Sequence, residues 1–489
     1  MHTFDLQHQL QADVPPHLVR LHLRVLGAFE HLLVRISTRE RALDEFLQRA
    51  TYRLQLWVDG ILETGDDSVH GMLQACELPP LDVALALHSL MLSPHRYFED
   101  SQLRFPQLNR LKEFPLAMVV AVLRADNSGY DGRECQPAAE RWKQVTGLEF
   151  EPTASMESDA TRVVRCPSCD EAARVPWAGA QGFAGPDFVH ACTKCEMPTT
   201  HDTLRAGKLF KALNKAKEAP GFCLPNTALL IRGELDVEMR CPAITNEVWS
   251  CFESGGGRLI PLHDVATMAA AEGRSIMAYV AETLSKPDSA IRPESIPALL
   301  RAFEHSFPFT QDVVDALHHQ RRFIQDIYHR GWSKLGTGRP SDAELDEAYA
   351  CYGEFLHLVT TAARREPAWK EDLIWHTHQL MPERYRANVV NYTGLFLDHL
   401  PRGEDINAYR PKYDGARNPV AVSIWVAHRG GIDRKGPGGD EPADPEHHQC
   451  GEECPASCPQ NCSCGCCQAG GAAMSFLRTE PVSNILEGR

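Results

Sequence analysis

One short pattern occurs twice in this chain, in copies that lie far apart. An apolar residue, a histidine, a leucine, a proline and an arginine–tyrosine pair follow the same spacing in Leu87–Tyr97 and in Trp375–Tyr385. Proline is tolerated in the first turn of a helix but not in its interior. The pattern therefore predicts a helix, a sharp stop and a second helix at both places, as two copies of one architectural unit.

The sequence around both copies has the apolar periodicity of helices. Apolar residues recur at three- and four-residue spacing through residues 16–64, 81–92 and 263–303. The same spacing predicts one long helix over residues 313–328 and another after Ser341, which begins a capping box. These segments predict a mostly α protein built from helical-bundle regions.

Shorter stretches between the helices predict other structures. We expect residues 152–159 to be a linker, 228–232 to be a strand and the glycines after Ser254 to form a turn. Residues 430–447 are rich in Gly, Pro and acids, which predicts a disordered linker. A cysteine-rich tail follows, which could bind soft metal ions or be a flexible low-complexity segment.

Two Cys-x-x-Cys pairs predict a zinc ribbon within residues 160–200. Their four ligand candidates are Cys166, Cys169, Cys192 and Cys195, and the stretch between the pairs has a length that suits a β-hairpin or loop. Four thiolates can surround one Zn²⁺ tetrahedrally and leave no position open for a substrate. The predicted zinc is therefore structural. The alternative is four cysteines without a ligand.

A basic helix is predicted directly after the ribbon. Arg205, Lys208, Lys211 and Lys215 share one face, and apolar residues share another. A ribbon beside a basic helix could contact phosphates, but a solvated basic face is the commoner explanation. The net charge of −15 also disfavours nucleic acid as a partner.

The second copy of the pattern offers candidate catalytic groups in Asp372, His376 and His378. Histidines at i and i+2 on a helix lie about 200° apart, so these two cannot bind one ion together. Asp372 and His376 share a face, which predicts a hydrogen bond. A packed structural motif is the main interpretation, with a metal site or a proton-transfer role as alternatives. We also raise the hypothesis that His88 and His376 face each other.

Several bulk properties restrict the cellular setting. No apolar run reaches the roughly 20 residues of a membrane span. The first residues lack the basic and apolar segments of a secretory signal, which predicts an intracellular protein, in the cytoplasm or alternatively the nucleus. In a reducing compartment the 17 cysteines are better explained as metal ligands or free thiols than as disulfides.

The sequence predicts five regions. Residues 1–150 form an N-terminal helical region with the first copy, 160–200 the zinc ribbon and 201–262 the basic helix and a mixed connector. Residues 263–400 form a C-terminal helical region with the second copy, and 401–489 a largely disordered tail.

Longer stretches around both copies resemble a known family. Residues 372–385 and 393–399, the earlier segment 82–100, the ribbon and residues 307–332 are similar to the glycine-rich domain-containing protein-like family of plants and fungi, in its ribbon-bearing fungal form. The resemblance implies little established biochemistry. Some fungal members are labelled 2-oxoglutarate-dependent dioxygenases, yet no histidine here begins the His-x-Asp or His-x-Glu triplet of that chemistry.

The leading functional hypothesis is a non-enzymatic, zinc-binding interaction or scaffold protein with protein partners. It rests on the closed thiolate site and on the lack of a recognisable nucleophile, phosphate or cofactor motif. Two alternatives remain: a metal-dependent enzyme that uses His376, His378 and a carboxylate, and a nucleic-acid binder that uses the ribbon and the basic helix.

Overall fold

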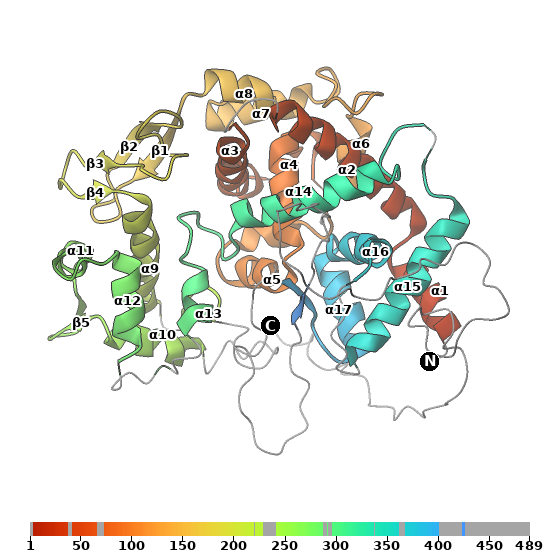
Figure 1. Ribbon diagram of the computed structural model, residues 1–489. Helices are drawn as coiled ribbons and strands as arrows, with labels where there is room; N and C mark the ends of the chain where they lie inside the picture. Colours follow the sequence, from red (N-terminus) through yellow and green to blue (C-terminus); the bar gives the residue numbers. More distant parts are fainter. Residues whose placement is uncertain are drawn as a thin grey trace, which may run out of the picture. The chain divides into compact units, whose positions relative to one another are not determined.

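A computed structural model gives the fold of the chain. It describes residues 3–37, 42–65, 73–219, 221–227, 241–286, 291, 296–336, 338–360, 367–400 and 423–425. The predicted strand at 228–232, the disordered linker at 430–447 and the cysteine-rich tail lie outside these residues. The expected mostly α fold is confirmed, since short two-stranded sheets accompany a large set of helices (Figure 1).

Helices from both ends of the described chain share one hydrophobic core. The N-terminal members are α1 (Thr3–Asp13), α2 (Pro16–Ser37), α3 (Ala42–Trp57), η1 (Val58–Leu62), α4 (Leu81–Met91), α5 (Pro94–Leu103), η3 (Pro106–Arg110), α6 (Leu116–Ala121) and α7 (Gln136–Thr146), and the short η2 (Ala75–Glu77) contacts α7. The C-terminal members are α14 (Val313–His329), α15 (Asp342–Thr360), α16 (Trp369–Gln379) and α17 (Pro382–Thr393). In Figure 1, α14 crosses α2 and α4, and all three contact one another. The core is therefore built from segments that are distant in sequence.

The two sequence copies form two similar helix pairs, α4–α5 and α16–α17. Each pair turns at the predicted proline, and the residue before it has nearly the same backbone angles: φ −117° and ψ 74° at Ser93, φ −121° and ψ 72° at Met381. The backbone amide of the tyrosine forms the same hydrogen bond in both pairs: Tyr97 N–H donates to the Ser93 carbonyl, and Tyr385 N–H donates to the Met381 carbonyl. The predicted helix–stop–helix unit is confirmed at both places.

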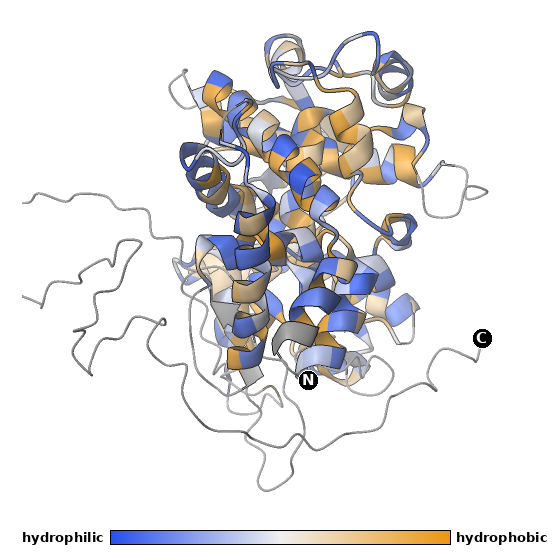
Figure 2. Cartoon of the chain, turned by 90° about the vertical axis from the view of Figure 1, so that its right-hand side faces the viewer, coloured by the Kyte–Doolittle hydropathy of each residue, from blue (hydrophilic) through white to orange (hydrophobic). Residues whose placement is uncertain are grey.

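The first helix of each pair is buried on all sides. Every residue of α4 is buried, as are residues 371–379 of α16. Most other helices carry both polar and apolar residues, as surface helices do (Figure 2). Polar side chains of α16 therefore lie inside the protein, where each needs a hydrogen-bond or ionic partner.

The ribbon consists of two short antiparallel hairpins. Strand β1 (Thr161–Arg165) pairs with β2 (Ala172–Pro176), and β3 (His190–Ala191) pairs with β4 (Pro198–Thr199). The predicted turn after Ser254 also forms a hairpin, between β5 (Glu253–Ser254) and β6 (Arg258–Leu259). Strand β7 (Asp398–Leu400) pairs in parallel with β8 (Ser423–Trp425).

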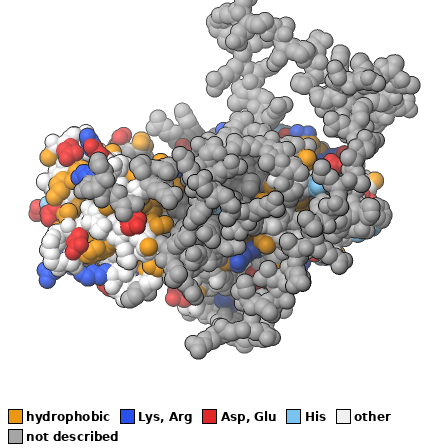
Figure 3. All heavy atoms as spheres, turned by 90° about the horizontal axis from the view of Figure 1, so that it is seen from below, with side chains coloured by type: hydrophobic (Ala, Val, Ile, Leu, Met, Phe, Trp, Pro, Cys, Tyr) orange, Lys and Arg blue, Asp and Glu red, His pale blue; other side chains and the backbone are white. Residues whose placement is uncertain are grey.

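A second hydrophobic cluster surrounds the helix that follows the ribbon. It contains α9 (His201–Glu218), α10 (Cys241–Ser250), α11 (Leu262–Ala271), α12 (Ile276–Leu284) and α13 (Ile296–Arg301). The apolar face predicted for α9 is confirmed, because Ala206, Leu209, Phe210 and Leu213 are buried. The view from below in Figure 3 shows hydrophobic, basic and acidic side chains interspersed on the described surface at its left.

One expected linker is a helix. The composition of residues 152–159 predicts a linker, but α8 spans Pro152–Ser158, with Glu151 accepting a hydrogen bond at its N-cap. The local composition suggests a linker, yet Arg53 donates to Ser155 and Arg49 to the Asp159 carbonyl, so α3 holds this segment in place. None of the helices in the described part of the chain has the length and apolar character that crossing a membrane requires.

Candidate metal centres

The four predicted zinc ligands meet at one point. The thiol sulfurs of Cys166 and Cys195 lie 3.5 Å apart, as do those of Cys169 and Cys192. All four sulfurs lie within 4.8 Å of one another. A tetrahedral zinc with Zn–S bonds of about 2.3 Å holds its sulfurs about 3.8 Å apart. The four thiols therefore fit one ion, whose identity the geometry does not specify.

Both Cys-x-x-Cys turns have the same backbone structure. The Asp170 amide donates to the Cys166 carbonyl, and the Glu196 amide donates to the Cys192 carbonyl. Asp170 and Glu196, which directly follow the second cysteine of each pair, have left-handed φ angles of 61° and 58°. Each turn thus directs its own backbone amides and two sulfurs toward a common point, as metal-binding knuckles do.

Backbone and burial affect the thiols differently. Amides of Cys195 and Lys194 donate to Cys192 and lower its pKa to about 6. The Glu171 amide favours the Cys169 thiolate, but burial and the neighbouring sulfurs outweigh it and raise the pKa of Cys169 to about 12. Four adjacent thiols resist full deprotonation, and a bound cation removes this obstacle because it stabilises each thiolate.

The ribbon packs against helices on two of its sides. Cys166, Cys192 and Met197 pack into the cluster around α9. On its other side, Trp177 packs edge-on against Tyr52 of α3, with ring centroids 5.7 Å apart. Arg162 lies buried over these rings and over Phe183 and Phe307. The ribbon therefore joins two helical groups.

The predicted basic face of α9 is only partly a surface. Lys211 is exposed and pairs with Asp170 of the ribbon. Lys208 was expected on the solvated face, but its ammonium group donates to the Phe309 carbonyl at 2.8 Å, and burial lowers its pKa to about 7. The helical wheel could not anticipate this, because the loop at residues 302–309 that covers Lys208 lies about 100 positions further along the chain.

The structure brings together only two of the three catalytic candidates. Asp372 and His376 lie one turn apart on α16, and the carboxylate Oδ1 is 3.0 Å from Nε2 of His376, which confirms the predicted contact. His378 points elsewhere: Tyr352 lies 3.1 Å from its Nδ1, and Asn388 lies 3.4 Å from its Nε2. Burial lowers the pKa of His378 to about 3, so this side chain is a neutral structural histidine.

The third member of the cluster is His399, which sequence reasoning missed. Its Nε2 lies 2.9 Å from Nε2 of His376 and 3.6 Å from Oδ1 of Asp372. These three side chains form a group whose ligand atoms could hold a metal ion. The only available signal was the resemblance of residues 393–399 to a family segment, because spacing alone does not connect α16 with β7.

His88 of the first copy forms a histidine pair of the same kind with His22 of α2. Nε2 of His88 lies 2.9 Å from Nε2 of His22, and Nδ1 of His22 lies 2.9 Å from the Thr377 hydroxyl. His22 therefore links the two copies, since it contacts His88 of the first and Thr377 of the second. That His88 and His376 face each other stays a prediction. Burial lowers the pKa of His22 to about 3.

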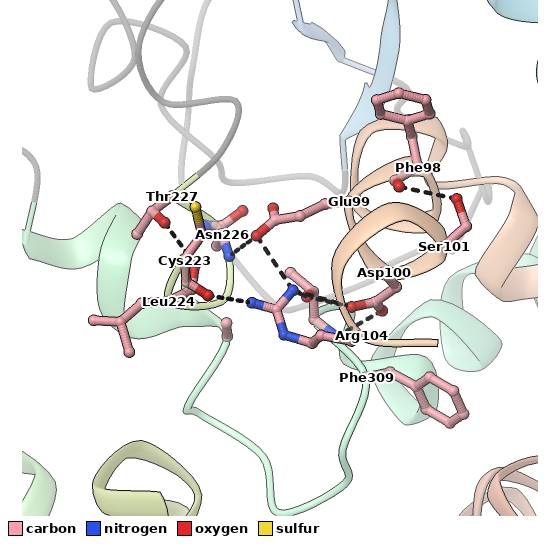
Figure 4. Close-up of polar contacts among 12 residues, drawn as sticks. Phe98, Glu99, Asp100, Ser101, Arg104, Cys223, Leu224, Asn226, Thr227 and Phe309 are labelled. Carbon is pink, nitrogen blue, oxygen red and sulfur yellow. Dashed lines mark hydrogen bonds and ion pairs between the residues drawn. The ribbon is translucent and has the colours of Figure 1, made fainter. Parts of the chain in front are cut away.

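Charged side chains in the C-terminal part of α5 form a buried ionic network (Figure 4). Arg104 lies 3.3 Å from Glu99 and 3.4 Å from Asp100, and also donates to the Cys223 carbonyl. The Asn226 amide donates to Glu99 at 2.8 Å. Burial raises the pKa of Glu99 to about 7, against the opposing effect of Arg104. This network fixes the 221–227 segment to the first helix pair.

One cysteine departs from the expectation that thiols are free or metal-bound. Cys223 is disulfide-bonded. The free cysteines of the described chain include Cys76, Cys135, Cys251 and Cys351 as well as the four ribbon thiols.

Comparison with known proteins agrees with the resemblance seen around the second copy. Residues 285–388 match the model of the family described as glycine-rich domain-containing protein-like. This segment belongs to the glycine-rich domain-containing protein-like family. It includes α14, α15, α16, the whole second copy and α17 up to Asn388, whereas the first copy and the ribbon lie outside it.

A curated plant protein matches a shorter stretch. Glycine-rich domain-containing protein 1 of Arabidopsis thaliana is 42% identical over 65 residues, which cover 12% of this chain and 8% of that protein. The chain thus matches less than a tenth of its relative's length. No solved structure is significantly similar to the chain.

Proposed function

We propose that this protein is a non-enzymatic scaffold or interaction protein in which a structural zinc ion holds two helical groups together. The proposal rests on the four thiols at Cys166, Cys169, Cys192 and Cys195, which meet at a spacing that suits Zn²⁺. With four protein ligands the ion has no open coordination position, so it acts on structure and not on a substrate.

The position of the ribbon explains what the zinc would do. One side of the ribbon packs with the cluster around α9, and the other packs on Tyr52 and Val314 of the main core. Short two-stranded hairpins are only marginally stable without further support. The metal supplies that support, so that the joint keeps the two groups, and any partners bound to them, in a fixed arrangement.

The proposed setting is the reducing interior of the cell, in the cytoplasm or the nucleus, where cysteines serve as zinc ligands. Protein partners fit better than nucleic acid, because Lys208 is withdrawn from the face of α9 and Lys211 is paired with Asp170. A net charge of −15 acts in the same direction. Imaging of the tagged full chain tests the location.

Metal analysis of the full chain tests the zinc itself. The Cys166→Ser, Cys169→Ser double variant should lose one equivalent of zinc relative to the wild-type chain. Limited proteolysis should then cut within residues 160–303, while fragments of the main core persist, because the main core does not depend on the ribbon ligands.

The matched control is Cys76→Ser, which removes a half-buried thiol outside the ribbon. It should keep the full zinc content and the wild-type digestion pattern. A double variant that retains all of its zinc, or that digests as the wild type does, would refute the structural role.

A further inference from the structure

Three ligand atoms from α16 and β7 converge in the interior. Asp372 and His376 lie on the same side of α16, and β7 brings His399 to them. The three separations are 2.9 Å between the two Nε2 atoms, 3.0 Å from Oδ1 to Nε2 of His376, and 3.6 Å from Oδ1 to Nε2 of His399. All three residues are buried.

These separations match those of ligands on one metal ion. With bonds of about 2.0–2.1 Å, an ion holds its ligand atoms about 3.3 Å apart in a tetrahedron and about 2.9 Å apart at right angles in an octahedron. Two imidazoles and one carboxylate are also ligands of medium hardness, which suit Zn²⁺, Fe²⁺ or Co²⁺ better than Ca²⁺ or Mg²⁺.

Hydrogen bonds alone do not account for this arrangement. Two Nε2 atoms that face each other share one proton, so one donates and the other accepts. The carboxylate Oδ1 of Asp372 is a second acceptor directed at the same place, so one of the close contacts among the three atoms would lack a proton. A cation between them interacts favourably with all three lone pairs.

The first copy provides an internal comparison. His88 and His22 make the same 2.9 Å contact between Nε2 atoms. The position that corresponds to Asp372 is Ala84, and Asp82, the acid of α4, pairs with Arg53 at 2.6 Å; among the described residues no carboxylate forms a metal-ligand group with His88 and His22. A histidine pair is therefore common to both copies, and the acid that completes a metal-ligand set is present only in the second.

We propose that Asp372, His376 and His399 bind one divalent transition-metal ion of the Zn²⁺ or Fe²⁺ class, separate from the ribbon ion. Aromatic rings surround the ligands: Phe323 lies 4.3 Å from the His376 ring and Trp375 lies 5.0 Å from the His399 ring, between ring centroids. Three protein ligands leave one position, which a water molecule would fill.

This ion would fix the chain after α17 to both copies at once. Successive side chains of a strand point to opposite sides. Asp398 accepts a hydrogen bond from the His95 amide at the start of α5, while the neighbouring His399 points to α16. Metal binding at His399 would therefore hold β7 between the two helix pairs.

The test measures metal bound to the full chain and its variants after loading with Co²⁺. Asp372→Asn and His399→Gln should each lose one equivalent of cobalt. Absorption from thiolate-to-cobalt charge transfer, which reports the ribbon, should not change. The reverse result is expected for the Cys166→Ser, Cys169→Ser variant, so failure of this site and failure of the ribbon site can be told apart.

His378→Gln is the matched control, because it removes a buried histidine from the same helix without touching the cluster. It should retain the cobalt. Retention of all cobalt by Asp372→Asn, or equal loss by His378→Gln, would overturn the proposal.

A measurement on the unaltered protein avoids any folding defect of the variants. X-ray absorption at the edge of the metal that copurifies with the wild-type chain should show nitrogen and oxygen ligands in addition to sulfur. A shell of sulfur alone would overturn the proposal.

Discussion

The two helix pairs share a backbone design but use their polar groups differently. In the first pair, Glu99 and Asp100 of α5 are held by Arg104, Asp82 of α4 pairs with Arg53, and Ala84 stands at the position of Asp372. In the second pair, the acid Asp372 lies on α16 beside the histidine pair. The comparison shows that the pattern specifies the turn between the helices, while residues outside it decide what chemistry each copy can support.

The largest expected effect tests the ionic network of the first copy. Arg104→Met should destabilise the protein by about 3–5 kcal/mol, because it leaves Glu99 and Asp100 buried without their cation. Urea unfolding at neutral pH measures the change. Tyr392 holds the corresponding position in the second copy, so Tyr392→Phe is the control and should cost far less. An equal loss of stability in the two variants would contradict the proposal that only the first helix pair depends on a buried cation at this position.

Glu99 gives a pH dependence that only the first copy should have. Its pKa is raised from 4.5 to about 7 in the folded protein, so the folded state binds more protons than the unfolded state between these values. Glu99 should therefore contribute a fall in stability of up to about 3 kcal/mol as pH rises from about 4.5 to 7, in opposition to the rise that the buried His22 and His378 produce between about 3 and 6.5.

Glu99→Gln should remove this contribution, because glutamine does not titrate, so the stability of the variant relative to the wild-type protein should increase as pH rises from about 4.5 to 7. Urea midpoints measured from pH 4.5 to 8 for both proteins provide the test. Parallel curves for the variant and the wild-type protein would show that Glu99 titrates normally.

The tyrosines that end the two patterns should differ in importance. The Tyr385 hydroxyl accepts a hydrogen bond from the Trp375 indole at 2.8 Å and donates to the Leu397 carbonyl, whereas the Tyr97 hydroxyl donates only to the Leu108 carbonyl among the contacts described. Tyr385→Phe should lower the free energy of unfolding by about 2–3 kcal/mol, because it leaves the buried Trp375 indole N–H without an acceptor. Tyr97→Phe should lower it by about 1 kcal/mol. Thermal melts of both variants measure the difference, and a larger cost at Tyr97 would contradict it.

The smallest effect concerns the contact of the second copy with His22 of α2. Thr377→Val removes the hydroxyl that lies 2.9 Å from Nδ1 of His22 and should cost about 1 kcal/mol. Ser89→Ala is the matched change in the first copy, where the hydroxyl bonds only to its own helix at the Leu85 carbonyl in the described structure. Hydrogen exchange in α2 should increase in the first variant and not in the second.

Local patterns in the sequence predicted much of the fold. Apolar spacing located α2, α3, α14 and α15, and the prolines located the turns at Pro94 and Pro382. Four cysteines in two short pairs predicted the ribbon, because a knuckle is formed by adjacent residues whose backbone determines where the sulfurs point.

The sequence by itself thus determined the elements, the repeated helix pair and the thiol cluster, all of which depend on neighbouring residues. Only the tertiary structure decided that His399 joins Asp372 and His376, that His22 meets His88, and that Lys208 is covered. Each of these contacts joins segments that no periodicity relates. Their partners are selected by how buried helices pack, and packing depends on the shapes of all the surrounding side chains at once.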